Sequence, residues 1–125
     1  MSVAALTYVS DLIQRLGIPY AFMRWNNEPP EDYYFVGEYI ERPSPTKEED
    51  GRQETTFILR GFTRKTWMLL EEAKDQIEKH CMKTAILDNG TGIAVFYDSA
   101  TVVPTGDAEL KSIKINLTIQ EWKVN

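Results

Sequence analysis

The sequence predicts an α+β fold, in which two helices pack on one face of a mostly antiparallel sheet of four to six strands. Three observations support this prediction. Two segments repeat apolar residues at helical spacing, several short segments between turn signals are rich in aromatic and β-branched residues, and residues 113–120 alternate strictly between apolar and polar. Short connections between the last three strands favour antiparallel pairing.

The first helix is expected over residues 3–16. Its apolar residues recur at three- and four-residue steps and therefore share one face: Val3, Leu6, Val9, Leu12, Ile13 and Leu16. Ser2 is the expected N-cap, and Gly17 followed by Pro19 is a typical helix end.

Two strands are expected next, over residues 20–25 and 33–41. Between them lies a turn cluster that contains Pro29 and Pro30, which have no N–H to donate to a strand partner. We expect these two strands to be antiparallel and joined by a loose loop.

Residues 42–52 form the most polar segment and are expected to be an exposed loop. One interpretation is a solvated hairpin tip. The other is a loop that becomes ordered only against a partner. A strand over residues 53–63 follows.

The second helix begins after this strand, with Thr63 or Thr66 as its cap. Acidic residues early in the segment and Lys79 with His80 late in it suit the helix dipole. The expected buried stripe consists of Trp67, Leu70, Ala73, Ile77 and Cys81.

A hairpin is expected where segments 83–88 and 93–97 flank Asn89-Gly90, a pair typical of a type I′ turn. Residues 99–109 are expected to be a loop. In the last strand Ile113, Ile115, Leu117 and Ile119 alternate with Lys114, Asn116, Thr118 and Gln120. One sheet face is therefore expected to be dry, and the other to meet water or a partner.

Composition narrows the function classes. At 125 residues the chain is expected to form one domain, residues 1–125, and no stretch approaches the ~18 apolar residues of a membrane span. Without a signal-peptide pattern, we expect a cytoplasmic product. The net charge of −5 argues against specific nucleic-acid binding, and Arg60, Arg64 and Lys65 are the nearest approach to a basic face.

No catalytic, cofactor or metal site is expected. Cys81 is the only cysteine and His80 the only histidine. Neighbouring side chains on a helix diverge by about 100°, so the two do not form a catalytic dyad. A zinc site would need four ligands that the chain does not obviously provide. A small enzyme that uses scattered carboxylates remains a third hypothesis.

The tryptophans differ in their expected roles. Trp67 belongs to the helical stripe, Trp25 is unassigned, and Trp122 falls on the polar phase of the last strand. An exposed tryptophan with Phe62, or with Tyr33 and Tyr34, nearby would form an apolar patch of the kind that marks an interface. The alternative is that the strand end wraps over the edge of the domain.

Five strings of residues, spread over nearly the whole chain, resemble the tail-terminator (tail-completion) family of long-tailed phages and prophages. They are Tyr34–Tyr39 (YFVGEY), Asp50–Leu59 (DGRQETTFIL), Thr84–Gly90 (TAILDNG), Val103–Lys111 (VPTGDAELK) and Ile115–Trp122 (INLTIQEW). Such proteins are encoded among head–tail joining genes.

The resemblance implies a subunit of a homo-oligomeric ring, commonly a hexamer, which is incorporated into the virion, caps the tail tube and contacts the head–tail connector. It brings no catalytic residues. Loops 42–52 and 99–109 would dock neighbours, and an acidic bore would let DNA slide. The expected interface residues are Tyr33, Tyr34, Lys47, Glu48, Glu49, Asp50, Arg52, Thr105, Asp107 and Trp122. The alternatives are a head-completion or neck protein, and a free-standing protein-binding regulatory module of a mobile element.

Overall fold

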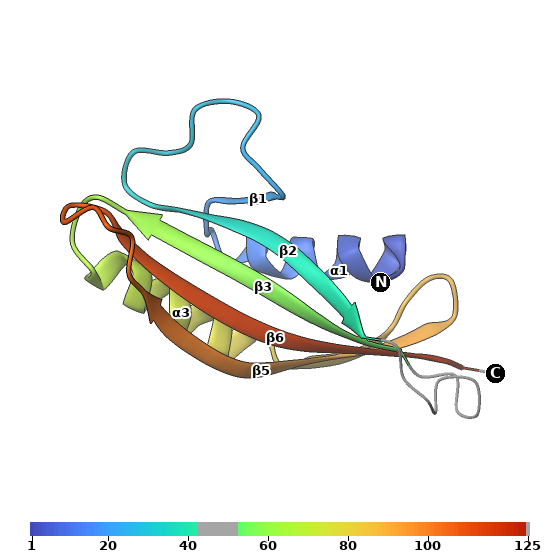
Figure 1. The fold of residues 1–125 in the computed structure, drawn as a ribbon. Helices are drawn as coiled ribbons and strands as arrows, with labels where there is room; N and C mark the ends of the chain where they lie inside the picture. Colours follow the sequence, from blue (N-terminus) through green and yellow to red (C-terminus); the bar gives the residue numbers. More distant parts are fainter. Residues whose placement is uncertain (43–52, 125) are drawn as a thin grey trace.

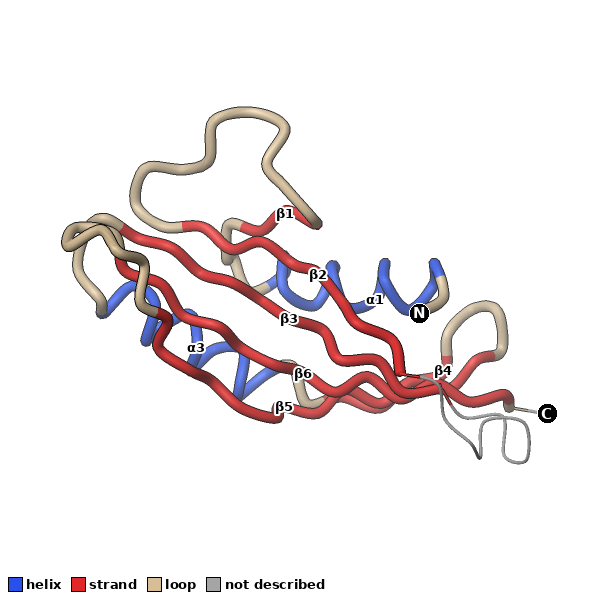
Figure 2. The backbone as a smooth tube through the Cα atoms, in the orientation of Figure 1, coloured by secondary structure: helices blue, strands red, loops and turns tan. Residues whose placement is uncertain are grey.

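The computed structural model describes residues 1–42 and 53–124. Along the chain, its helices and strands are α1 (Val3–Arg15), β1 (Tyr20–Phe22), β2 (Tyr34–Arg42), β3 (Gln53–Thr63), α3 (Met68–His80), β4 (Lys83–Ile86), β5 (Thr91–Val103) and β6 (Lys111–Lys123). The strands form one six-stranded sheet in the order β1-β2-β3-β6-β5-β4 (Figure 2). The predicted α+β class is confirmed.

Both helices lie on the same side of the sheet, behind it in the view of Figure 1. The core between helices and sheet is one apolar cluster. Helix α1 contributes Ala5, Val9 and Ile13, and α3 contributes Leu70, Ala73 and Ile77. Most of the two predicted helical stripes thus packs against one sheet face, with Leu6, Leu12, Leu16 and Trp67 partly buried. Val3 was wrongly included in the first stripe, because it lies at the first position of α1 and is 82% exposed.

Strand β6 lies at the centre of the sheet, between β3 and β5. Its four alternating apolar residues, Ile113, Ile115, Leu117 and Ile119, are all at most 2% exposed and belong to the core. The intervening residues from Lys114 to Gln120 point to the opposite face and are partly exposed. The strict alternation in the sequence therefore identified both faces.

Helix α1 begins and ends as predicted. The Ser2 hydroxyl accepts a hydrogen bond from the Ala5 N–H at 3.1 Å. Gly17 follows the helix with a φ of +77°, a value that favours glycine. The predicted cap of the second helix is wrong, because the N-cap position of α3 is Trp67, which makes no side-chain capping bond.

The predicted antiparallel pairing of the first two strands is wrong. Strand β1 pairs with β2 in parallel, with Tyr20 opposite Phe35 and Phe22 opposite Gly37. The residues between them, 23–33, are too many for a tight hairpin and lead the chain back to the end of the sheet from which β1 started (Figure 1). A sharp bend at Met23, whose φ is 68°, begins this return.

The hairpin also differs from the prediction, since β4 ends at Ile86 and not at residue 88, and β5 begins at Thr91 and not at residue 93. Strand β5 continues to Val103, so residues 99–103 belong to the sheet and not to a loop. A bulge between Tyr97 and Ser99 absorbs Asp98 as an extra residue and lets the ladder resume. The Asn89-Gly90 turn is not type I′, because only Gly90 has a positive φ. Instead, Leu87 and Thr91 close a three-residue connection.

Candidate interaction surface

The side of the sheet opposite the helices is not covered by either helix, and we call it the open face. Cross-strand registers place the following residues on it: Tyr34, Val36, Glu38, Ile40, Thr56, Ile58, Arg60, Phe62, Lys114, Asn116, Thr118, Gln120, Trp122, Ala94, Phe96, Ser99 and Thr101. Most of them are partly or fully exposed. The open face is therefore a continuous surface built on four neighbouring strands, β2, β3, β6 and β5.

One end of the open face is aromatic. The rings of Tyr34 and Phe62, which are opposite each other on β2 and β3, stack at 5.3 Å between centroids. Trp25 meets Tyr34 edge-on at 6.2 Å, and its indole N–H donates to the Phe35 carbonyl at 3.2 Å. A shallow groove beside them is lined by Pro29, Pro30 and Arg64 among others.

The middle of the open face is polar at its surface. Arg60 donates to the Glu38 carboxylate at 2.7 Å across the β2–β3 pair. Ile58 lies opposite Glu38 and is only 4% exposed, although no helix packs on it. Asn116 donates its side-chain N–H to the Ser99 hydroxyl at 3.0 Å. Neighbouring polar side chains thus shield the apolar centre of this face.

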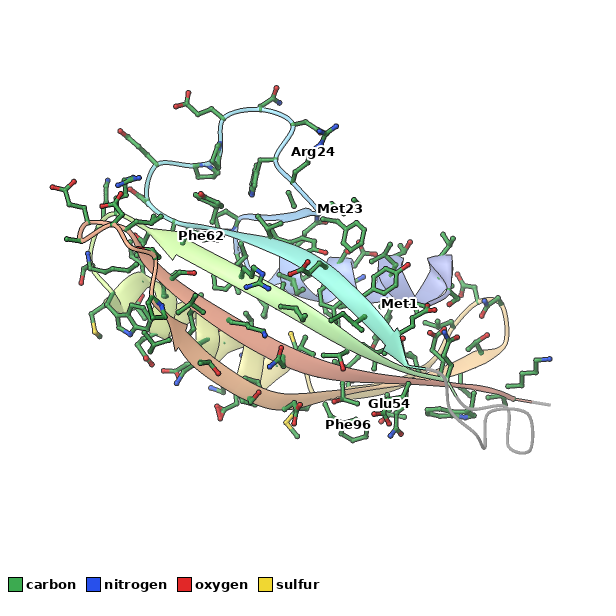
Figure 3. All side chains as sticks on the ribbon, viewed as in Figure 1. Met1, Met23, Arg24, Glu54, Phe62 and Phe96 are labelled. Atoms are coloured by element: carbon green, nitrogen blue, oxygen red, sulfur yellow. The ribbon has the colours of Figure 1, made fainter. Side chains whose placement is uncertain are left out.

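The other end of the open face exposes apolar side chains. Ile40 is 54% exposed and Phe96 is 42% exposed. Phe96 and Glu54 mark this end of the sheet in Figure 3. Trp122 packs flat over Gly92, which is opposite it on β5; a Cβ at Gly92 would lie 2.3 Å from the indole. The indole therefore needs the glycine beneath it.

Two stretches of strand lie at the borders of the sheet without a neighbour among the described strands. The first is Glu38–Arg42 of β2, because β1 pairs only with Phe35–Gly37. The second is Ser99–Val103 of β5, because β4 pairs only with Gly92–Val95. We call them the β2 edge and the β5 edge. Each presents backbone N–H and C=O groups that another strand can use.

The structure separates two of the predicted interface residues that are adjacent in sequence. Tyr34 lies on the open face, but Tyr33 lies on the helix side, where its ring meets Phe35 edge-on at 6.3 Å. Burial raises the pKa of Tyr33, and the nearby carboxylate of Glu72 raises it further. Trp122 shares the open face with Tyr34, at the opposite end.

Thr105 and Asp107 lie in the β5–β6 connection and shape it from within. The Thr105 hydroxyl lies 2.8 Å from the Leu110 carbonyl and 2.9 Å from the Asp107 carbonyl. The Asp107 carboxylate accepts from the Glu109 N–H at 3.0 Å and from Arg64 at 2.9 Å. These two bonds lower the pKa of Asp107. Both residues thus have a local structural role.

The remaining predicted interface residues lie outside the described residues: Lys47, Glu48, Glu49, Asp50 and Arg52. Three contributors to the open face were missed by sequence reasoning, namely Trp25, Ile40 and Phe96. Ile40 and Phe96 could have been found from their place on the polar phase of their strands. Trp25 lies in the connection that follows β1, and its contact with Tyr34 depends on the path of that connection.

The thiol of Cys81 has the properties of a buried core side chain. Cys81 is 1% exposed, and burial raises the pKa of its thiol to about 11. At neutral pH the thiol is therefore protonated and a poor nucleophile. His80, the next residue back along the chain, is the last residue of α3 and is partly exposed.

Within residues 1–42 and 53–124, no three His, Cys, Asp or Glu residues are grouped so that they could hold a metal ion. Over the same residues, neither helix has the length and hydrophobicity of a membrane span. Neither a scan against models of protein families nor a search of curated proteins finds a match to this chain. The open face and the two edges are thus the features from which a function is inferred.

Proposed function

We propose that this chain is a structural subunit of a long-tailed phage or prophage, a tail terminator that assembles into a ring at the junction of tail and head. In this role it acts by protein–protein recognition and without catalysis. Its partners are further copies of itself, the tail-tube protein and the head–tail connector. The subunit is made in the cytoplasm and enters the virion with the tail.

The open face is the observation that carries this proposal. A sheet with helices on one side only, and with strand edges available at both borders, suits a subunit whose neighbours complete it. Exposed Ile40 and Phe96 beside a polar centre resemble the mixed composition of protein interfaces. The resemblance of the five strings to tail terminators is the reason for proposing a ring at the junction of tail and head.

Electron microscopy of tails tests the proposal. We expect that deleting the gene from an inducible prophage yields tails of abnormal, mostly excessive length, because nothing halts tube growth. Adding the purified chain to polymerising tube protein from the same gene cluster should stop elongation. Tails of normal length that lack heads would contradict the terminator role and would favour a head-completion or neck protein.

Light scattering during size-exclusion chromatography tests the assembly step. We expect a ring, or a ring that forms once tube ends are added. A monomer or dimer that ignores tube ends and binds a regulatory protein would favour the free-standing binding module instead.

A further inference from the structure

We infer that neighbouring copies of this chain join edge to edge, with the β2 edge of one copy adding as an antiparallel strand to the β5 edge of the next. This inference rests on the self-association in the proposed function and identifies the surfaces that perform it. The partner is therefore a second copy of this chain, and the bonds across the seam are backbone hydrogen bonds.

Strand direction favours this arrangement. Three successive antiparallel pairings, β2 with β3, β3 with β6 and β6 with β5, separate the two edges. The strands β2 and β5 consequently run in opposite directions. A second copy in the same orientation, set beside the first, presents its β2 antiparallel to the β5 already there. The contact is heterologous, so each copy uses both edges.

One register pairs every residue of the β2 edge with a residue of the β5 edge. It places Tyr39 opposite Val102 and Ile40 opposite Thr101, with Glu38 opposite Val103 and Arg42 opposite Ser99. In each copy Tyr39 and Val102 point to the helix side, whereas Ile40 and Thr101 point to the open face. Slipping by one residue would put paired side chains on opposite faces.

The side chains along this register are compatible. The β5 edge, Ser99–Val103, carries no charge, so Glu38 and Glu41 meet no like charge opposite them. Within their own copy Glu38 pairs with Arg60, and Glu41 pairs with the N-terminal amino group of Met1. Val102 is 66% exposed and Tyr39 is 38% exposed. Beside Val102 lies a shallow pocket of about 380 Å³ whose lining includes Trp67 and Leu110. The neighbour's Tyr39, whose ring stacks on Phe22 of its own copy at 6.0 Å between centroids, would lie opposite Val102.

The positions of β1 and β4 set the stagger between copies. Ile40 lies level with Thr118 of β6, whereas Thr101 lies level with Lys114, so the neighbour shifts by about four residues, or roughly 13 Å. Between its two edges, each copy contributes four adjacent strands, which together are about 19 Å across. The strands would then tilt about 35° from the ring axis, within the range found in closed barrels. The shift also moves β1 and β4 past the ends of the paired edges.

Disulfide trapping tests the register. Because directly opposite pairs alternate between two spacings, we would make both Tyr39→Cys/Val102→Cys and Ile40→Cys/Thr101→Cys. The matched control is Ile40→Cys/Val102→Cys, which uses the same edges but places the two thiols on opposite faces. Cys81 stays in place because its thiol is buried. Under mild oxidation, we expect a ladder of covalent oligomers from at least one opposite-pair variant, reversed by reductant.

Three results would overturn the inference. The first is an opposite-pair yield no higher than that of the wrong-face control. The second is single-cysteine variants at 101 or 102 that dimerise as fully as the paired variants, since this would indicate two-fold pairing of β5 with β5. The third is a ring seen by light scattering without register-specific cross-links, in which case the proposed function would stand without this seam. Conversely, a ladder of covalent oligomers from a protein whose gene deletion leaves tails unchanged would support the seam and contradict the proposed function.

Discussion

The hydroxyl Oγ of Ser2 lies 2.6 Å from Oε1 of Glu121, although the two residues are 119 positions apart in the sequence. Glu121 is only 5% exposed, and the Ser2 N–H lies 3.4 Å from each of its carboxylate oxygens. The same hydroxyl caps α1 by accepting from the Ala5 N–H. One serine therefore begins the first helix and ties it to the last strand.

Replacing Ser2 should cost stability through both of these contacts. We expect Ser2→Ala to lower the free energy of unfolding by about 1–3 kcal/mol, because it removes a cap and leaves a buried carboxylate with its weaker partners. Urea unfolding measures the effect. Thr7→Ala, at an exposed position of the same helix, should change stability by less than about 0.5 kcal/mol. In a double-mutant cycle with Glu121→Gln the two losses should not add, and full additivity would argue against the contact.

A methyl group at Gly92 should collide with Trp122. The added Cβ would lie 2.3–2.6 Å from three indole atoms, and such overpacking usually costs about 1–3 kcal/mol. We therefore expect Gly92→Ala to lower the urea midpoint. The same change in a Trp122→Leu background should cost clearly less. An equal cost in both backgrounds would mean that Trp122 does not pack over this glycine.

The two sheet faces should respond differently to truncation. Ile115 is fully buried beneath the helices, so Ile115→Ala should cost about 2–5 kcal/mol. Phe96 is 42% exposed on the open face, and Phe96→Ala should cost less than about 1 kcal/mol when the chain is monomeric. Unfolding followed at low protein concentration compares the two. Equal losses would indicate that something covers the open face.

The thiol of Cys81 predicts a loss of stability in alkali. Burial raises its pKa from 9.0 to about 11, so the folded state favours the protonated form. Below pH 9 both folded and unfolded states hold the proton and the thiol makes no difference. Between pH 9 and 11 the unfolded state ionises first, and stability falls.

A comparison with Cys81→Ala isolates this contribution, since the tyrosines and lysines titrate in both proteins. We expect the wild type to lose more stability than the variant between pH 9 and 11. Parallel pH profiles would show that the thiol is not buried in the folded state. At pH 8, thiol reagents should label the wild type only as fast as it unfolds.

Local patterns in the sequence were sufficient for most of the elements. The alternation from Ile113 to Ile119 reports burial directly, because a strand has a fixed period. The helical stripe was right for Val9 and Ile13 but wrong for Val3, which is exposed at the start of α1. The bounds of β3 were predicted to the residue. Strand β5 was cut short at Tyr97 because Asp98 and Ser99 look like a turn when the bulge that accommodates them is unknown.

The long-range relationships were beyond such patterns. Whether β1 runs parallel or antiparallel to β2 depends on the path of residues 23–33, and no periodicity encodes that path. Tyr33 and Tyr34 were grouped as one candidate, yet adjacent strand residues point to opposite faces. Which tryptophan would lie near Phe62 and Tyr34 could not be read from the sequence: Trp122 lies at the opposite end of β6, and Trp25 is the one that meets Tyr34.

The central position of β6 has a consequence for how the chain folds as it is synthesised. The ribosome makes β6 after the seven other helices and strands of residues 1–42 and 53–124, and β6 lies between β3 and β5 in the sheet. Until it emerges, the nascent chain holds two partial sheets whose inner borders and apolar sides are unsatisfied, and such states are prone to aggregation. Folding is thus expected to be completed only after translation of β6, and a ribosome that stalls before Lys111 should hold a protease-sensitive chain.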